Sequence, residues 1–92
     1  MYVLRVQHSV PDYAAWKAAF DSDPLGREKS GVKSYRILRP ADDPGHVMID
    51  LDFDTAAEAE ALEAALREMW TRVTVAVDPQ SQIVEVVETR QY

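Results

Sequence analysis

His8 is the residue of this chain whose type and position best suit chemistry near neutral pH, where imidazole exchanges protons. It ends an alternating segment, Tyr2–His8, that is typical of a β-strand. The alternation places His8 on the same face as Leu4 and Val6, just before a strand-to-helix loop. We therefore expect His8 to act as a general acid or base on a bound molecule. The alternative is a structural role, in which the ring only bonds a backbone carbonyl group.

Aromatic residues supply the other candidates for a site. Tyr35 faces the same side as His8, and its hydroxyl group is a second candidate catalytic group that would orient a phenolic or keto oxygen. Trp16, Phe20 and Trp70 are candidate substrate-binding residues that would wall a pocket for an aromatic molecule. The alternative for all four is ordinary packing. His46, beside turn residues, is expected in an exposed loop.

Composition excludes several functional classes. The chain has no cysteine and only two histidines, so we expect no metal site and no other cofactor. Glycine-rich phosphate loops and nucleophile-elbow serines are also absent. The net charge of −6 argues against nucleic acid or an anionic membrane as a partner. The first expected strand begins at residue 2, and no apolar run approaches the roughly 20 residues of a membrane span, so we expect a cytoplasmic protein.

The segment from Val32 to Asp54 predicts the central β-hairpin. Two alternating runs flank a cluster of turn residues, Asp42 to Gly45. If the turn centres on that cluster, opposed residues fall into register so that Arg36 faces Asp50 on one side of the hairpin. In the same register Tyr35 faces Leu51, Ile37 faces Ile49 and Leu38 faces Met48. The Arg36–Asp50 pair is interpreted first as an ordinary cross-strand ion pair.

The remaining elements are two helices and a last strand. Pro11-Asp12 predicts the start of a helix, which Asp23-Pro24 ends, and a short turn is expected between Arg27 and Ser30. Thr55 and Glu58 form a capping box at the start of a second helix, Ala56 to about Val73. We expect a short extension over Val75 to Val77, a loop at Asp78-Pro79, and a last strand from Gln82 to Arg90.

The resulting order, β-α-β-β-α-β, predicts an α+β fold of the ferredoxin-like type within a single domain, residues 1–92. A four-stranded antiparallel sheet would carry both helices on one face, with the first and third strands in the middle. The other face would be too apolar for open water and too polar for a core. We therefore expect it to close against a second copy as a homodimer interface. The interface candidates share that face and are Arg5, Arg36, Leu38, Met48 and Asp50.

The first-helix segment Val10-Pro-Asp-Tyr-Ala-Ala-Trp-Lys-Ala-Ala-Phe and the pattern Gly31-Val-Lys-Ser-Tyr-Arg-Ile-Leu-Arg, with Val47 to Asp54, resemble the dimeric α+β barrel superfamily. The resemblance covers nearly the whole chain and lies in the pattern of elements. It implies that two sheets close into a barrel in the dimer, and that substrate lies between sheet and helices of each subunit. The superfamily includes antibiotic-biosynthesis monooxygenases without metal or flavin, isomerases, cyclases, haem-degrading enzymes and stress-responsive proteins. Haem-degrading members carry an iron-ligating histidine on the second helix, and this chain has none there.

Two hypotheses about function follow. The first is a small enzyme without cofactor, of the monooxygenase, cyclase or isomerase kind, acting on an aromatic or polyketide-like molecule. The second is a dimer without catalytic activity that binds a ligand or has a stress-related structural role. A cavity of about 300 Å³ or more between sheet and helices, with His8 in its wall, would favour the first.

Overall fold

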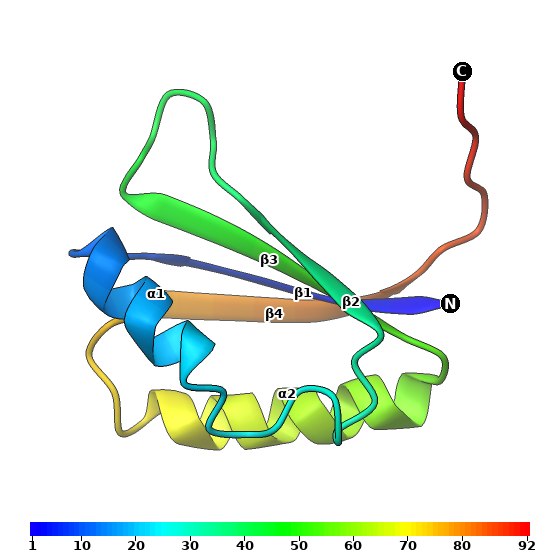
Figure 1. Cartoon of the computed structure of the whole chain (residues 1–92), viewed down its shortest axis with the longest axis horizontal. Coiled ribbons are helices and arrows are strands. Elements are labelled where there is room, and N and C mark those ends of the chain that lie inside the picture. The colour runs from blue at the N-terminus through cyan, green and yellow to red at the C-terminus, as the bar shows by residue number, and fades with distance from the viewer.

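A four-stranded antiparallel sheet with two helices on one face makes up the computed structural model, which describes residues 1–92 (Figure 1). The elements are β1 (Tyr2–Ser9), α1 (Tyr13–Asp21), β2 (Ser34–Leu38), β3 (His46–Phe53), α2 (Ala56–Trp70) and β4 (Val77–Glu85). The strand order is β2-β3-β1-β4. The predicted α+β ferredoxin-like fold is therefore confirmed, with the first and third strands in the middle of the sheet.

The hairpin register is also confirmed. Tyr35 pairs with Leu51, and Arg36 pairs with Asp50, as the turn cluster predicts. β1 lies on the other side of β3, so that Arg5 also pairs with Asp50. The sheet thus places a carboxylate between two arginines on three neighbouring strands.

The core lies between the sheet and the helices. Every second residue of the two central strands is buried there, from Leu4 and Val6 on β1 to Phe53 on β3. Trp16 of α1 and Leu62 of α2 pack against these strands. The core cluster comprises Leu4, Val6, Val10, Trp16, Val32, Val47, Ile49, Leu51, Phe53, Ala59 and Leu62. Because both helices contribute to the cluster, one face of the sheet is covered.

Side chains at both helix starts satisfy free backbone N–H groups. The Asp12 carboxylate accepts a hydrogen bond from the backbone of Ala15 at 3.2 Å, so Asp12 caps α1 and the helix begins one residue later than predicted. At α2, the Thr55 hydroxyl oxygen accepts from the backbone of Glu58 at 3.2 Å, as the capping motif predicts. The second helix ends at Trp70, three residues before the predicted end.

The last strand lies five residues earlier than predicted. β4 begins at Val77 and includes Asp78-Pro79, which the sequence placed in a loop, whereas Val86 to Arg90 lie outside any strand. Two features reconcile turn residues with a strand. β4 is at the edge of the sheet, where a proline is tolerated, and Asp78 adopts a φ of 52° where the β1–β4 register shifts.

The chain after β4 leaves the sheet on the side away from the helices (Figure 1). Val87 is 85% exposed in this segment. Neither α1 nor α2 has the length and apolar character required to cross a lipid bilayer.

Candidate active site

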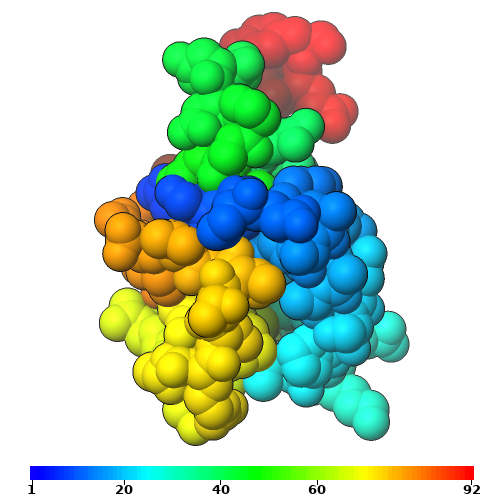
Figure 2. All heavy atoms as spheres, turned by 90° about the vertical axis from the view of Figure 1, so that its left-hand side faces the viewer, coloured from blue at the N-terminus to red at the C-terminus, as the bar shows by residue number.

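An apolar cleft of about 360 Å³ lies between the sheet and the two helices. Figure 2 shows the end of the molecule where α1 (blue, right) faces the segment after α2 (yellow to orange, left). The floor consists of Val6, His8, Ile49 and Leu51, all on the helix side of the central strands. The other lining residues are Trp16, Ala19, Phe20, Ser22, Asp23, Pro24, Leu25, Arg27, Leu62, Leu66, Met69, Trp70, Val73, Val75 and Ala76.

His8 is the imidazole of this cleft and is 3% exposed. Its Nδ1 lies 3.2 Å from the carbonyl oxygen of Ser9. A carbonyl group only accepts, so Nδ1 carries the proton and Nε2 is left with the lone pair. Burial lowers the pKa of His8 below its ordinary 6.5; the Ser9 bond opposes this effect, and the nearby His46 adds to it. His8 is therefore a neutral base at pH 7. Its bond to the Ser9 carbonyl is also the contact expected if His8 had only a structural role.

Aromatic rings continue from His8 along α1. The Trp16 ring lies edge-on to His8 with centroids 5.7 Å apart, and the Phe20 ring follows 5.2 Å from Trp16. Both rings line the cleft, because positions four apart on a helix share one face. Trp70 of α2 lines the cleft as well. The structure thus brings together four of the five residues that the sequence singled out.

Tyr35 is the fifth, and it does not line the cleft. Its ring packs edge-on against Phe20 with centroids 5.1 Å apart, and the residue is 43% exposed. The parity of β2 predicts the correct face. However, β2 is an edge strand, and four of its five residues are exposed. Tyr35 is therefore separated from the cleft that contains His8.

Arg27 and Asp23 are polar groups of the cleft that the sequence did not reveal. Asp23 has a φ of 52°, a left-handed conformation that aspartate tolerates better than most residues. Its carboxylate accepts a hydrogen bond from the backbone of Arg27 at 2.9 Å. This bond folds the turn after α1 back over Phe20, and the Arg27 guanidinium carbon lies 4.0 Å from the centre of that ring. The only signal in the sequence was the turn predicted around these residues.

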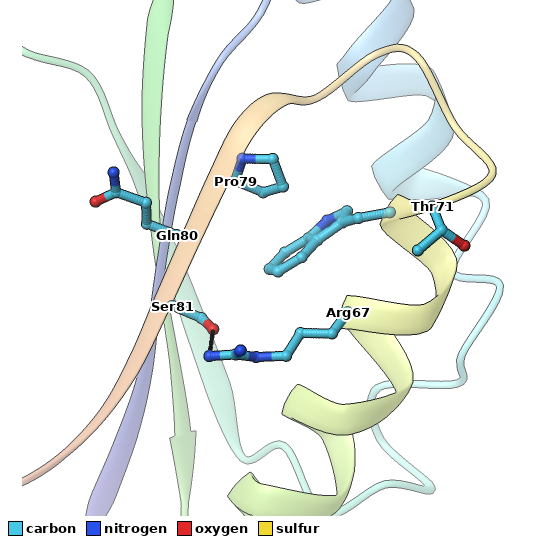
Figure 3. Close-up of a pocket in the computed structure, with 6 residues that line it drawn as sticks. Arg67, Thr71, Pro79, Gln80 and Ser81 are labelled. Carbon is cyan, nitrogen blue, oxygen red and sulfur yellow. Dashed lines mark hydrogen bonds between the residues drawn. The ribbon is translucent and has the colours of Figure 1, made fainter.

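A second hollow, of about 440 Å³, lies beside the cleft and shares Trp70 with it. It is more open and more polar, with Arg67, Thr71, Pro79, Gln80 and Ser81 as its other lining residues (Figure 3). Arg67 reaches from α2 to the Ser81 hydroxyl at 3.3 Å, whereas Gln80 extends to the other side of β4. The smaller cleft is the better candidate site because it is apolar and contains the buried imidazole.

The opposite face of the sheet carries the charged cluster. Arg5 donates two hydrogen bonds to the Asp50 carboxylate, at 2.9 and 3.0 Å, and Arg36 donates one at 3.3 Å. The bonds from Arg5, followed by that from Arg36, lower the pKa of Asp50 below its usual 3.8 although its burial opposes the shift. Leu38 and Met48 pair beside this cluster, so all five residues expected at a dimer interface share one face.

Comparison with solved structures places this architecture among known proteins. A mutant of the protein MhuD, crystallised with two manganese protoporphyrin IX molecules per active site, is similar over 100% of both chains, with 19% identity and a TM-score of 0.71. A Nitrosomonas europaea protein proposed to be an antibiotic biosynthesis monooxygenase matches with 23% identity and a TM-score of 0.60, over 96% of this chain and 100% of its own. The chain therefore shares the fold of these two proteins.

A dimeric ferredoxin-like protein from an uncultured marine organism has the same fold, with 14% identity, a TM-score of 0.66 and 97% coverage of both chains. At these identities the similarity establishes the fold alone. No family model and no curated protein sequence matches the chain.

The haem site implied by the family resemblance does not fit this chain. Its second helix, α2, contains no histidine, and the imidazole on the cleft wall belongs to His8 on β1. The chain therefore lacks the iron ligand that the resemblance implies on this helix.

Proposed function

We propose that this protein is a homodimeric enzyme that acts on an aromatic or polyketide-like molecule without a cofactor, with His8 as its base. The observation that supports this most directly is a buried imidazole in the wall of an apolar cleft of about 360 Å³. That volume lies within the range of small-molecule sites. A cavity of this volume also means that side chains do not fill the space between the sheet and the helices.

The chemistry available to His8 is proton transfer. Nε2 would remove a proton from a phenolic hydroxyl group or from an acidic CH₂ group beside an aromatic ring, leaving an imidazolium and a phenolate or carbanion. Because burial favours neutral His8, the imidazolium is a strong acid in this setting and readily returns its proton. Proton transfer by one well-placed side chain contributes roughly 10²- to 10⁴-fold to a rate.

Two reactions could follow from that step, and both are of the kinds that the family resemblance implies. If the proton returns to another atom, the reaction is an isomerisation or a cyclisation. If the carbanion instead reacts with O₂, the CH₂ group becomes a C=O group and the second oxygen atom leaves as water. The substrate then supplies all four electrons that reduce O₂. The apolar walls would favour the second reaction, because a bound substrate would leave little room for water beside the carbanion.

The site residues are proposed as follows. His8 is the base, and Trp16, Phe20 and Trp70 bind the aromatic rings of the substrate. The second copy would pack on the face that holds Asp50, and the cleft would remain open within each subunit.

Turnover of a fused-ring phenol that carries an acidic CH₂ group tests the proposal, with O₂ consumption and product mass as readouts. We expect His8→Ala to lower kcat by about 10²-fold or more while leaving probe binding within a few-fold. Ser9→Ala is a matched control, because it keeps the backbone carbonyl that orients the ring. Full turnover by the His8 variant would remove it from the chemistry. Binding without turnover by the wild type would support the non-catalytic alternative.

A further inference from the structure

Arg27 gives the cleft lining a guanidinium group, paired with the Asp23 carboxylate, that the proposed proton transfer does not use. Apart from the indole N–H groups, the polar side chains of the lining are His8, Ser22, Asp23 and Arg27. The Ser22 hydroxyl group donates to the carbonyl of Ala19 at 2.6 Å, and one Asp23 oxygen accepts from the Arg27 backbone. With His8 neutral, the Arg27 guanidinium is the one cation in the wall.

The position of Arg27 is fixed by the protein. Its Nη1 donates to the carbonyl oxygen of Phe20 at 2.8 Å, and its side chain is only 20% exposed. The guanidinium lies over the rings of Phe20 and Tyr35, with its carbon 4.0 and 5.2 Å from their centres. A guanidinium held in this way is preorganised for a ligand, because little conformational entropy remains to be lost.

Most of its hydrogen-bonding capacity remains available. The Phe20 carbonyl is the one protein group that accepts a hydrogen bond from the guanidinium, which has five N–H donors. Arg27 also forms an ion pair with Asp23, whose nearest oxygen lies 3.4 Å from Nη1 and accepts a hydrogen bond from the Arg27 backbone. No buried polar side-chain atom in the protein lacks a partner, so the remaining donors are accessible rather than enclosed by apolar atoms.

His8 and Arg27 lie at opposite ends of one aromatic wall. The contacts run from His8 to Trp16, from Trp16 to Phe20, and from Phe20 to Arg27. An aromatic ring placed along Trp16 and Phe20 would therefore have a base at one end and a cation at the other.

We infer that the cleft selects aromatic molecules that carry a carboxylate or another anionic oxygen group, which Arg27 binds while the ring lies along Trp16 and Phe20. This inference rests on the proposed function, since it assumes that the cleft is the substrate site. Carboxylates match the planar fork of arginine, and charge-assisted hydrogen bonds are about twice as strong as neutral ones. A neutral ligand of the same shape would leave the guanidinium with a poorer partner.

Calorimetric titration with 2-naphthoate and its neutral isostere, 2-naphthamide, tests the inference. We expect wild-type protein to bind the carboxylate about 10- to 100-fold more tightly than the amide. In Arg27→Gln this preference should fall below about threefold while amide binding is retained. Arg39→Gln is the matched control. That arginine also lies over an aromatic ring, Tyr13 at 4.9 Å, but outside the cleft.

The outcomes separate the two proposals. If neither probe binds the wild type, the cleft is not an aromatic site and the proposed function fails first. If both bind equally, or if Arg27→Gln keeps the preference, the cleft remains a site but the role of Arg27 is wrong. If Arg27→Gln does not fold, Arg27→Lys and the salt dependence of wild-type binding decide. The preference for carboxylate should weaken between about 0.05 and about 0.5 M NaCl, and a preference unaffected by salt would overturn the inference.

Discussion

Replacing Asp50 by asparagine tests how much the charged cluster on the open face of the sheet stabilises the fold. Asp50 is 5% exposed and accepts three hydrogen bonds from two arginines. The asparagine side chain would keep one acceptor oxygen and turn an NH₂ group toward cationic N–H donors. Breaking a fully buried ion pair costs about 3–5 kcal/mol, whereas exposed pairs contribute about 0–1 kcal/mol.

The Asp50 cluster lies between these limits, because the side chains of Arg5 and Arg36 remain 51% and 72% exposed. We therefore expect Asp50→Asn to lower the free energy of unfolding by about 2 kcal/mol at pH 7, within the range for hydrogen bonds to charged groups. For a chain of this size, that corresponds to a fall in Tm of roughly 8–16 °C.

Urea unfolding at two protein concentrations measures this effect and separates it from dimerisation, which makes stability depend on concentration. Asp52→Asn is the control, since that neighbouring carboxylate accepts only the Ser34 hydroxyl among side chains. The pKa of Asp50 is lowered in the folded protein. Its contribution to the free energy of unfolding is therefore complete above pH 3.8, the ordinary pKa, and disappears as pH falls through the pKa of the folded state. A loss below about 0.5 kcal/mol at pH 7, or an equal loss at about pH 2, would refute the electrostatic explanation.

Three further predictions concern the cleft, the turns and the assembly. Because folding disfavours protonated His8, stability should fall as pH drops below 6.5. In urea titrations between about pH 7.5 and about pH 5, the free energy of unfolding should fall less in His8→Gln than in the wild type. Parallel pH dependences of the two proteins would contradict this prediction. Gly31→Ala should destabilise the protein by about 1–3 kcal/mol, because φ is 101° and the new Cβ would overlap the Glu58 carboxylate. Gly45→Ala, with its nearest atom at 3.4 Å and no positive φ, should cost much less. Met48→Glu should convert the proposed dimer to monomer in sedimentation at micromolar concentration, and an unchanged dimer would place the interface elsewhere.

Local patterns in the sequence were sufficient for most of the fold. Strict alternation in β3 and the turn cluster before it determine the register, because a shift by one residue would exchange the core side chains with Asp50 and its neighbours. The Thr55–Glu58 capping box gave the start of α2 correctly. Such signals lie within a few residues of one another and need no knowledge of the tertiary structure.

The errors arise where tertiary contacts override local preference. Asp78-Pro79 favours a turn, yet both residues lie within an edge strand, because their neighbours Val77 and Gln80 pair with β1 on either side of a register shift. Arg27 lies seven residues after Phe20, and its place in the cleft depends on how the intervening turn folds. The exposed position of Tyr35 likewise follows from its place on the edge strand β2 and not from strand parity.

The two outer edges of the sheet have different capacities for growth. β4 is interrupted by a proline without an N–H group and by the twisted backbone at Asp78, whereas the five residues of β2 pair with β3 on one side and have no strand on the outer side. A backbone ladder with another molecule can therefore run along the full length of β2, whereas on β4 it would be interrupted at Asp78-Pro79. If two copies joined through β2, the outer edge left on each would be β4. Further growth through strand edges would then be confined to the regular part of β4 after Pro79.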